Sequence, residues 1–243
     1  MMKTTLLSIP FFLFSIQSVY ANTTEQDIKQ KCAQVKQYAQ LGKKFYDQKQ
    51  YSKALEQFKD QAAWSSFCLY NQDISGTKLT ENDVVIANNN VGLTYAKLNK
   101  PQWARAWYLK DKEAKSSQFN LSQLPQPKLS TDLSGTYVNS AGFGQWNTIK
   151  VSKKKISYDL SFEGLYFPPY GLISGPNLGE FDTSMSLKQK HATYQYEDCK
   201  ITLDFKFKPA EGHVITVKQN ESQSGCGFGH NVWASGQYLK VEK

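Results

Sequence analysis

The chain has 243 residues, 40% of them hydrophobic, and a formal net charge of +8 at pH 7. Its positive charge comes almost entirely from lysine, because Arg105 is the only arginine. Arginine supplies the planar, two-pronged hydrogen bonding with which proteins read phosphates and bases. We therefore do not expect nucleic acid as a partner, and we interpret the charge as a lysine-rich solvated surface with weak attraction to anionic envelope polymers.

The first residues have the pattern of a secretory signal peptide. Lys3 precedes an apolar run from Leu6 to Ile16, and Val19-Tyr20-Ala21 places compact residues where a signal peptidase cleaves. No apolar run of membrane-spanning length follows Ala21. We predict that residues 1–21 are a signal peptide and that the mature protein is periplasmic or secreted, without stable membrane insertion.

A spacing of small and large residues occurs twice in the first half. The first copy comprises Leu41-Gly42, Phe45, Ala54 and Phe58, and the second, 50 residues later, comprises Val91-Gly92, Tyr95, Ala104 and Tyr108. Gly and Ala suit the places where two antiparallel helices come closest, and aromatic residues fill the wider gaps. The pattern predicts two antiparallel helical hairpins. It resembles tetratricopeptide repeats, although their period is about 34 residues and Asn88 stands where an aromatic residue is expected.

The resemblance implies a concave groove lined by the first helix of each hairpin. Its lining residues would be Lys36, Lys43 and Tyr46 from one hairpin and Asn89 and Leu93 from the other. Lysine and asparagine would hold a carboxylate or the backbone of a peptide, and tyrosine and leucine would hold its side chains. The alternative is that these residues form ordinary solvated surface.

Four cysteines in an exported chain predict disulfides, for which three connectivities are possible. If the first hairpin turns near Lys49-Gln50, Cys32 precedes the turn by about as many residues as Cys68 follows it, and the two meet at the open end. Cys199 opens one predicted strand and Cys226 follows the next strand. A second bond would tie that hairpin to the loop after it.

Residues 116–132 contain two prolines and several serines and glutamines, a composition that ends the helices and marks a linker. Beyond them, apolar and polar residues alternate, as in Ile156–Phe162 and Ile201–Phe207. This period of two predicts seven or eight short antiparallel strands in a small barrel or sandwich. We therefore predict an α+β two-domain protein, with a helical domain over residues 22–119, a linker over 120–132 and a β domain over 133–243.

A glycine-rich stretch near the end contains Cys226-Gly227-Phe228-Gly229 and, further on, Gly236-Gln237-Tyr238. It resembles the closing segment of small β domains in exported bacterial proteins, which sometimes lie beside lysozyme-inhibitor-like modules. The resemblance implies a fold more than an activity. The glycines would allow a tight loop with positive φ beside the disulfide.

Residues 164–179 form a long apolar loop with Tyr166, Phe167 and Tyr170 around two prolines. Exposed aromatic side chains on a rigid loop would make a binding edge. The alternative is that they plug the mouth of the barrel.

Few residues have the spacing of a catalytic or metal site. His191, His213 and His230 are scattered, and only Cys226 and His230 approach the spacing of zinc ligands, so we expect neither a metal nor a cofactor. The strongest enzyme alternative is a Cys226 nucleophile with His230 or His191, as in papain-like peptidoglycan hydrolases. Those enzymes place the cysteine at a helix N-terminus, whereas Cys226 lies among glycines.

These observations favour a non-enzymatic, exported protein that binds a protein or peptide of the cell envelope. The first alternative is an inhibitor or immunity protein against a cell-wall hydrolase, where the positive charge favours an acidic or neutral target. The second alternative is a Cys/His cell-wall hydrolase.

Overall fold

The computed structural model describes residues 17–221 and 225–243, with only the backbone described for residues 17–24. The predicted signal peptide thus lies largely outside the described residues. The helices of the first half are α1 (Gln17–Ala33), α2 (Val35–Asp47), α3 (Tyr51–Tyr70), α4 (Gln72–Ser75), α5 (Glu81–Lys97), α6 (Pro101–Leu109) and α7 (Lys115–Ser122). None of the helices in the described ranges is both long and apolar enough to cross a membrane.

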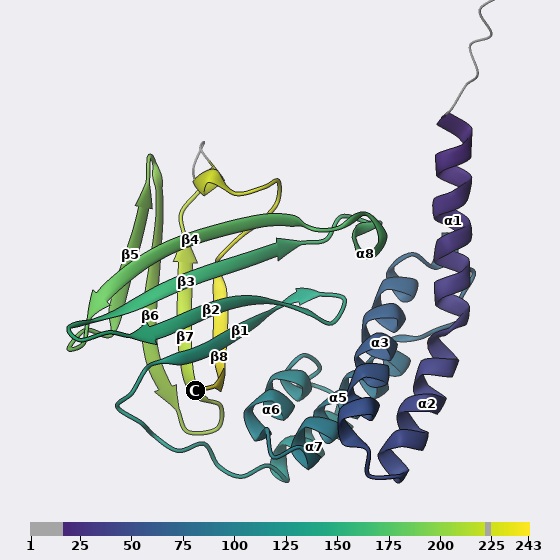
Figure 1. The fold of residues 1–243 in the computed structure, drawn as a ribbon, viewed down its shortest axis with the longest axis horizontal. Coiled ribbons are helices and arrows are strands. Elements are labelled where there is room, and N and C mark those ends of the chain that lie inside the picture. Colours follow the sequence, from purple (N-terminus) through teal and green to yellow (C-terminus); the bar gives the residue numbers. More distant parts are fainter. Residues whose placement is uncertain (1–16, 222–224) are drawn as a thin grey trace, which may run out of the picture.

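Helices α2 and α3 form one antiparallel hairpin and α5 and α6 form the next, as the spacing predicts (Figure 1). The turns match as well as the helices, because Lys49 and Asn99, 50 residues apart, have φ of 59° and 56°. Within the hairpins, a Cβ added to Gly42 would lie 2.5 Å from the Phe58 ring, and one added to Gly92 would lie 2.2 Å from the Tyr108 ring. The glycines are therefore the points of closest approach in both hairpins.

This contact predicts an unusual sign for a helical substitution. Alanine normally stabilises a helix relative to glycine by about 0.5 to 1 kcal/mol. Gly92→Ala is instead expected to lower the free energy of unfolding by about 1 to 3 kcal/mol, because the added methyl group overlaps the Tyr108 ring. Denaturant unfolding measures the change.

A double-mutant cycle supplies the control for that prediction. In a Tyr108→Ala background the ring is gone, so the same Gly92→Ala change should cost much less or become stabilising. Equal costs in the two backgrounds would show that the ring and the glycine do not determine the packing.

The helices continue further than the sequence predicts. We expected them to end near Ser116, but α7 (Lys115–Ser122) follows and extends into the segment predicted as linker. The reason is a contact with α5: Ser117 is buried, and its Oγ accepts a hydrogen bond from Asn89 Nδ2 at 2.9 Å. A polar stretch thus becomes helical because buried amides on another helix satisfy it.

The second half is one antiparallel sheet curved into a nearly closed barrel (Figure 1). Its strands are β1 (Gly135–Gly142), β2 (Gln145–Lys153), β3 (Ser157–Tyr166), β4 (Asn177–Ser186), β5 (His191–Tyr196), β6 (Cys199–Lys208), β7 (Gly212–Gln219) and β8 (Gly236–Glu242), in the order β4-β3-β2-β1-β8-β7-β6-β5. The end strands β4 and β5 share no ladder, but Thr183 Oγ1 donates a hydrogen bond to the Thr193 carbonyl at 2.7 Å. The α+β architecture with an antiparallel, barrel-like β half is therefore as predicted.

The two faces of the sheet pack against different partners. Alternate side chains such as Tyr137, Phe162 and Tyr238 point inward and form the core of the barrel. On the outer face, Val138 and Leu239 belong to a second apolar cluster that includes Ala106 of α6. Helix α6 thus covers one outer face of the sheet, and the helical half and the barrel share a core.

The turn between β1 and β2 strengthens this junction. Phe143, at the turn, packs edge-on against Phe67 of α3 with ring centroids 5.3 Å apart. Trp146 of β2 packs edge-on against Trp107 of α6 at 5.4 Å. These aromatic contacts make the two halves of the chain one packed body.

Both predicted disulfides are present, with Cα–Cα distances of 5.7 Å for Cys32–Cys68 and 5.1 Å for Cys199–Cys226. Around the second bond, Gly225, Cys226 and Gly227 have φ of 59°, 61° and 73°. Three consecutive left-handed residues confirm the predicted tight loop, and two of the three positions are glycines because other residues are strained there.

Candidate functional site

The residues of the predicted tetratricopeptide-like groove differ in exposure. Lys36 and Lys43 are exposed on α2, and Lys43 pairs with Asp47 one turn later at 2.7 Å. Tyr46 is half-buried and packs edge-on against Tyr51. Leu93 is exposed on α5. These four side chains remain accessible to a ligand.

Asn89 has a different role. It is 5% exposed, its Nδ2 donates to the Val85 carbonyl and to Ser117 Oγ, and its Oδ1 accepts from Asn120 Nδ2. The amide therefore joins α5 to α7 and is not available to a ligand in this arrangement. The interpretation of Asn89 as a groove residue does not hold, because α7 covers the position.

The apolar loop over residues 164–179 docks on the helical half. Phe167 packs edge-on against Phe143 at 6.1 Å, and Asn71 of the helical half donates a hydrogen bond to the Pro169 carbonyl at 3.1 Å. The short helix α8 (Gly171–Ser174) brings Leu172 to the cluster around Cys32–Cys68. Tyr166 is half-buried and Tyr170 exposed. The loop thus buttresses the junction, a role that neither sequence interpretation included.

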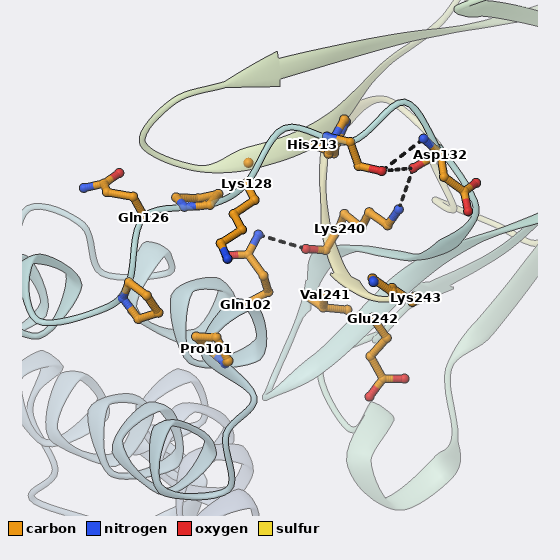
Figure 2. A pocket seen from close by; sticks show the side chains of 14 residues that line it. Pro101, Gln102, Gln126, Lys128, Asp132, His213, Lys240, Val241, Glu242 and Lys243 are labelled. Carbon is orange, nitrogen blue, oxygen red and sulfur yellow. Dashed lines mark hydrogen bonds between the residues drawn. The ribbon is translucent and has the colours of Figure 1, made fainter.

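A different feature is the best candidate for a site: an open pocket of about 650 Å³ where the halves meet, which we call the junction pocket (Figure 2). Four segments line it. They are residues 101–102 at the start of α6, residues 125–132 of the linker, residues 212–213 at the start of β7, and residues 240–243 at the end of β8. This volume lies within the range of small-molecule and peptide pockets.

Polar contacts beneath the junction pocket hold its segments together. Gln102 Nε2 donates to the carbonyls of Glu211 and Lys240, at 3.1 and 3.3 Å. Arg105 is 4% exposed and donates to Gln102 Oε1, to the Ala210 carbonyl and to the Pro125 carbonyl, at 3.0, 2.8 and 2.8 Å. The only arginine of the chain therefore ties α6 to the linker and to the turn before β7.

His213 is held neutral in the wall of the pocket. The side chain is 8% exposed, and its Nε2 accepts a hydrogen bond from the Ser130 backbone N–H at 3.0 Å. Burial, together with Lys240 and Lys190, lowers the pKa of this imidazole. Because Nε2 is an acceptor, the neutral ring carries its proton on Nδ1.

Lysines line the junction pocket, and Lys240 and Lys243 lie close enough to interact. Lys128, Lys240 and Lys243 all line it. The pKa of Lys240 is lowered by burial and by Lys243, while Asp132 acts in the opposite direction. Positive charge is therefore concentrated around the half-buried Lys240 side chain.

The two carboxylates that line the pocket accept hydrogen bonds from residues outside it. Glu242 accepts hydrogen bonds from Trp103 Nε1 at 2.8 Å and Lys100 Nζ at 3.2 Å, and Figure 2 shows its side chain pointing away from His213. Asp132 Oδ1 accepts from the backbone N–H and the hydroxyl of Ser134, at 3.0 and 2.8 Å. Both hydrogen-bond sets lower the pKa of the carboxyl concerned. Glu242 is therefore paired with a lysine outside the pocket, whereas Asp132 partly offsets the charge of Lys240 within it.

Sequence reasoning did not find this pocket. Its lining comes from four segments that are far apart in the chain, and each is unremarkable alone. The only local signal is Pro125-Gln126-Pro127-Lys128, a rigid stretch that also suits a plain linker.

The enzyme alternative requires a free Cys226 thiol beside a histidine. Cys226 is bonded to Cys199, so its sulfur is not a thiolate nucleophile. His230 is exposed, and His191 is an exposed cross-strand partner of Asp204 at 2.8 Å. Among the described residues, no group of three or more His, Cys, Asp or Glu side chains is arranged to hold a metal ion.

Comparison with known proteins adds no relative: no protein-family model, no curated protein and no solved structure matches the chain. The likeness of the hairpins to tetratricopeptide repeats therefore remains a resemblance in residue spacing, and functional inference depends on the site itself.

Proposed function

We propose that this chain is an exported, non-enzymatic binding protein that holds a protein or peptide of the cell envelope in the junction pocket. The observation that carries the proposal is the construction of the pocket. It is open, it is formed jointly by both halves and the linker, and lysines and prolines line it. Binding sites of this kind combine apolar surface with a few polar groups that orient the ligand.

The rest of the molecule supports a binding role. Two disulfides suit an oxidising compartment outside the cytosol. The shared core between α6 and the sheet fixes the relative position of the segments that line the pocket. A preformed pocket loses little conformational entropy when a ligand enters, which favours binding.

Site-specific photo-crosslinking in the native cells tests the proposal. A photoreactive residue is placed at Lys128 in the junction pocket or, as the matched control, at Lys36 on α2, and the adducts are identified by mass spectrometry. Adducts from position 128 alone are the expected result. Adducts from position 36 alone would favour the tetratricopeptide-like groove and contradict the junction pocket.

A second candidate function, inhibition of a cell-wall hydrolase, is favoured by a different observation. The Cys199–Cys226 bond fixes a tight loop, and two aromatic side chains are exposed before and after it in the sequence: Tyr196, three residues before Cys199, and Trp233, seven residues after Cys226. Rigid loops with exposed aromatic side chains suit insertion into an enzyme cleft. A photoreactive residue at Trp233 that captures a hydrolase, which the purified protein then inhibits, would establish this function; capture of other proteins only would exclude it.

A further inference from the structure

We propose that the ligand of the junction pocket is an acidic peptide segment, whose carboxylates bind Lys128, Lys240 and Lys243 and whose apolar side chain packs between the prolines. This inference rests on the proposed function and specifies its ligand. It follows from the hydrogen-bonding capacity, charge balance and shape of the pocket.

The ammonium groups of the pocket lysines have unused hydrogen-bond donors. An ammonium group carries three N–H donors. Lys240 Nζ makes one hydrogen bond, to the Asp132 carbonyl at 3.1 Å, and that acceptor is uncharged. For Lys128 and Lys243, no acceptor or ion pair is found among the residues that the structure describes. The pocket can therefore donate several hydrogen bonds to an anion without breaking an existing ion pair.

The charge balance also selects an anion. Lys243 disfavours the charged form of Lys240, and Lys240 disfavours that of His213, so positive charges repel one another in the pocket. Asp132 offsets this repulsion only in part, because burial and Lys243 together still lower the pKa of Lys240, and Glu242 is engaged by Trp103 and Lys100. A bound carboxylate would relieve it, and a cationic ligand would increase it.

The shape of the pocket distinguishes a peptide from a simple anion. Pro101, Pro125 and Pro127 form apolar walls. At the base, a Cβ added to Gly212 would lie 2.7 Å from Gln102 Nε2 and 3.1 Å from Pro127 Cβ, so this glycine permits close contact between β7, α6 and the linker. An inorganic anion contacts only the lysines. A peptide with an apolar side chain between two acidic ones contacts both the lysines and the proline walls.

Fluorescence polarisation tests the ligand class with two labelled hexapeptides, one of alternating Glu and Leu and one of alternating Gln and Leu. We expect the acidic peptide to bind about tenfold more tightly than the neutral one at low ionic strength. The Lys128→Gln/Lys243→Gln variant should bind the acidic peptide about tenfold more weakly than the wild type. The control variant Lys36→Gln/Lys43→Gln loses the same charge from the exposed face of α2 and should bind like the wild type.

Histidine NMR supplies a second readout at the pocket. Bound carboxylates should raise the pKa of His213, seen as a shift of its ring C–H titration. The ring C–H signals of exposed His230 should not move when the peptide is added at constant pH. Thermal melts of each variant verify folding.

Three results would overturn the inference: equal affinity for both peptides, equal loss of affinity in the pocket and control variants, or full displacement of the peptide by inorganic phosphate at matched charge concentration. The proposed function fails separately. A Lys128 adduct with a partner, combined with no preference for the acidic peptide, overturns only the ligand class. The lack of any adduct from position 128 overturns the function.

Discussion

Replacing Cys199 and Cys226 together by alanine is expected to lower the free energy of unfolding by about 3 to 4 kcal/mol. The bond closes a loop with a sequence separation of 27, so its loss returns considerable conformational entropy to the unfolded chain. The native state also loses support, because the bond holds the left-handed turn that places Phe228 against Phe162, with ring centroids 5.7 Å apart. Denaturant unfolding of the oxidised proteins measures the difference.

The Cys32→Ala/Cys68→Ala variant is the matched control. Its loop has a separation of 36, so the entropic cost is similar, but the bond lies in the helical half. Limited proteolysis should therefore cleave near residues 225–232 only in the first variant, and near α1 only in the second. A loss below about 1 kcal/mol in the first variant would mean that Phe228 packing, not the bond, holds the loop.

Replacing Arg105 by methionine is expected to lower the free energy of unfolding by about 2 to 4 kcal/mol. Methionine preserves much of the volume but leaves three acceptors, on Gln102, Ala210 and Pro125, without their donor. Burial lowers the pKa of this guanidinium, so removing a buried charge offsets part of the loss. Because the same contacts fix the base of the junction pocket, binding of the acidic peptide should weaken in the same variant.

Arg105→Lys tests whether geometry or charge matters. Lysine keeps the charge but lacks the planar fork that reaches three acceptors in different directions, so its stability should lie between those of the wild type and the methionine variant. If the Arg105→Met variant is as stable as the wild type, the role assigned to Arg105 is contradicted. If the Arg105→Lys variant is as stable as the wild type, a positive charge alone is sufficient at this position.

Much of the architecture follows from local sequence patterns. The Gly42 and Gly92 spacing predicts both hairpins and their turns, since the closest approach of two connected helices is set by residues near each other in the chain. The alternation after residue 132 predicts the strands because burial of one sheet face imposes a period of two. Both disulfides follow from the positions of the cysteines relative to predicted turns and strands.

The candidate site could not be predicted in the same way. Asn89 and Ser117 satisfy each other across two helices, and so a polar stretch that predicts a linker becomes α7. The aromatic loop around Phe167 finds its partner in Phe143, more than twenty residues away and in another hairpin. In both cases a long-range contact overrides what the local composition indicates.

The amino-acid sequence by itself therefore determined the helical hairpins, the barrel strands and the sulfur pairing, because each depends on neighbours in the chain or on a repeated period. Tertiary structure alone decided where a ligand could bind. The junction pocket exists because Arg105 and Gln102 bring the linker and the ends of β7 and β8 against α6, and lysines from separate segments then face one space. Charge concentrated in this way depends on distances in the folded chain, and residue spacing in the sequence does not contain them.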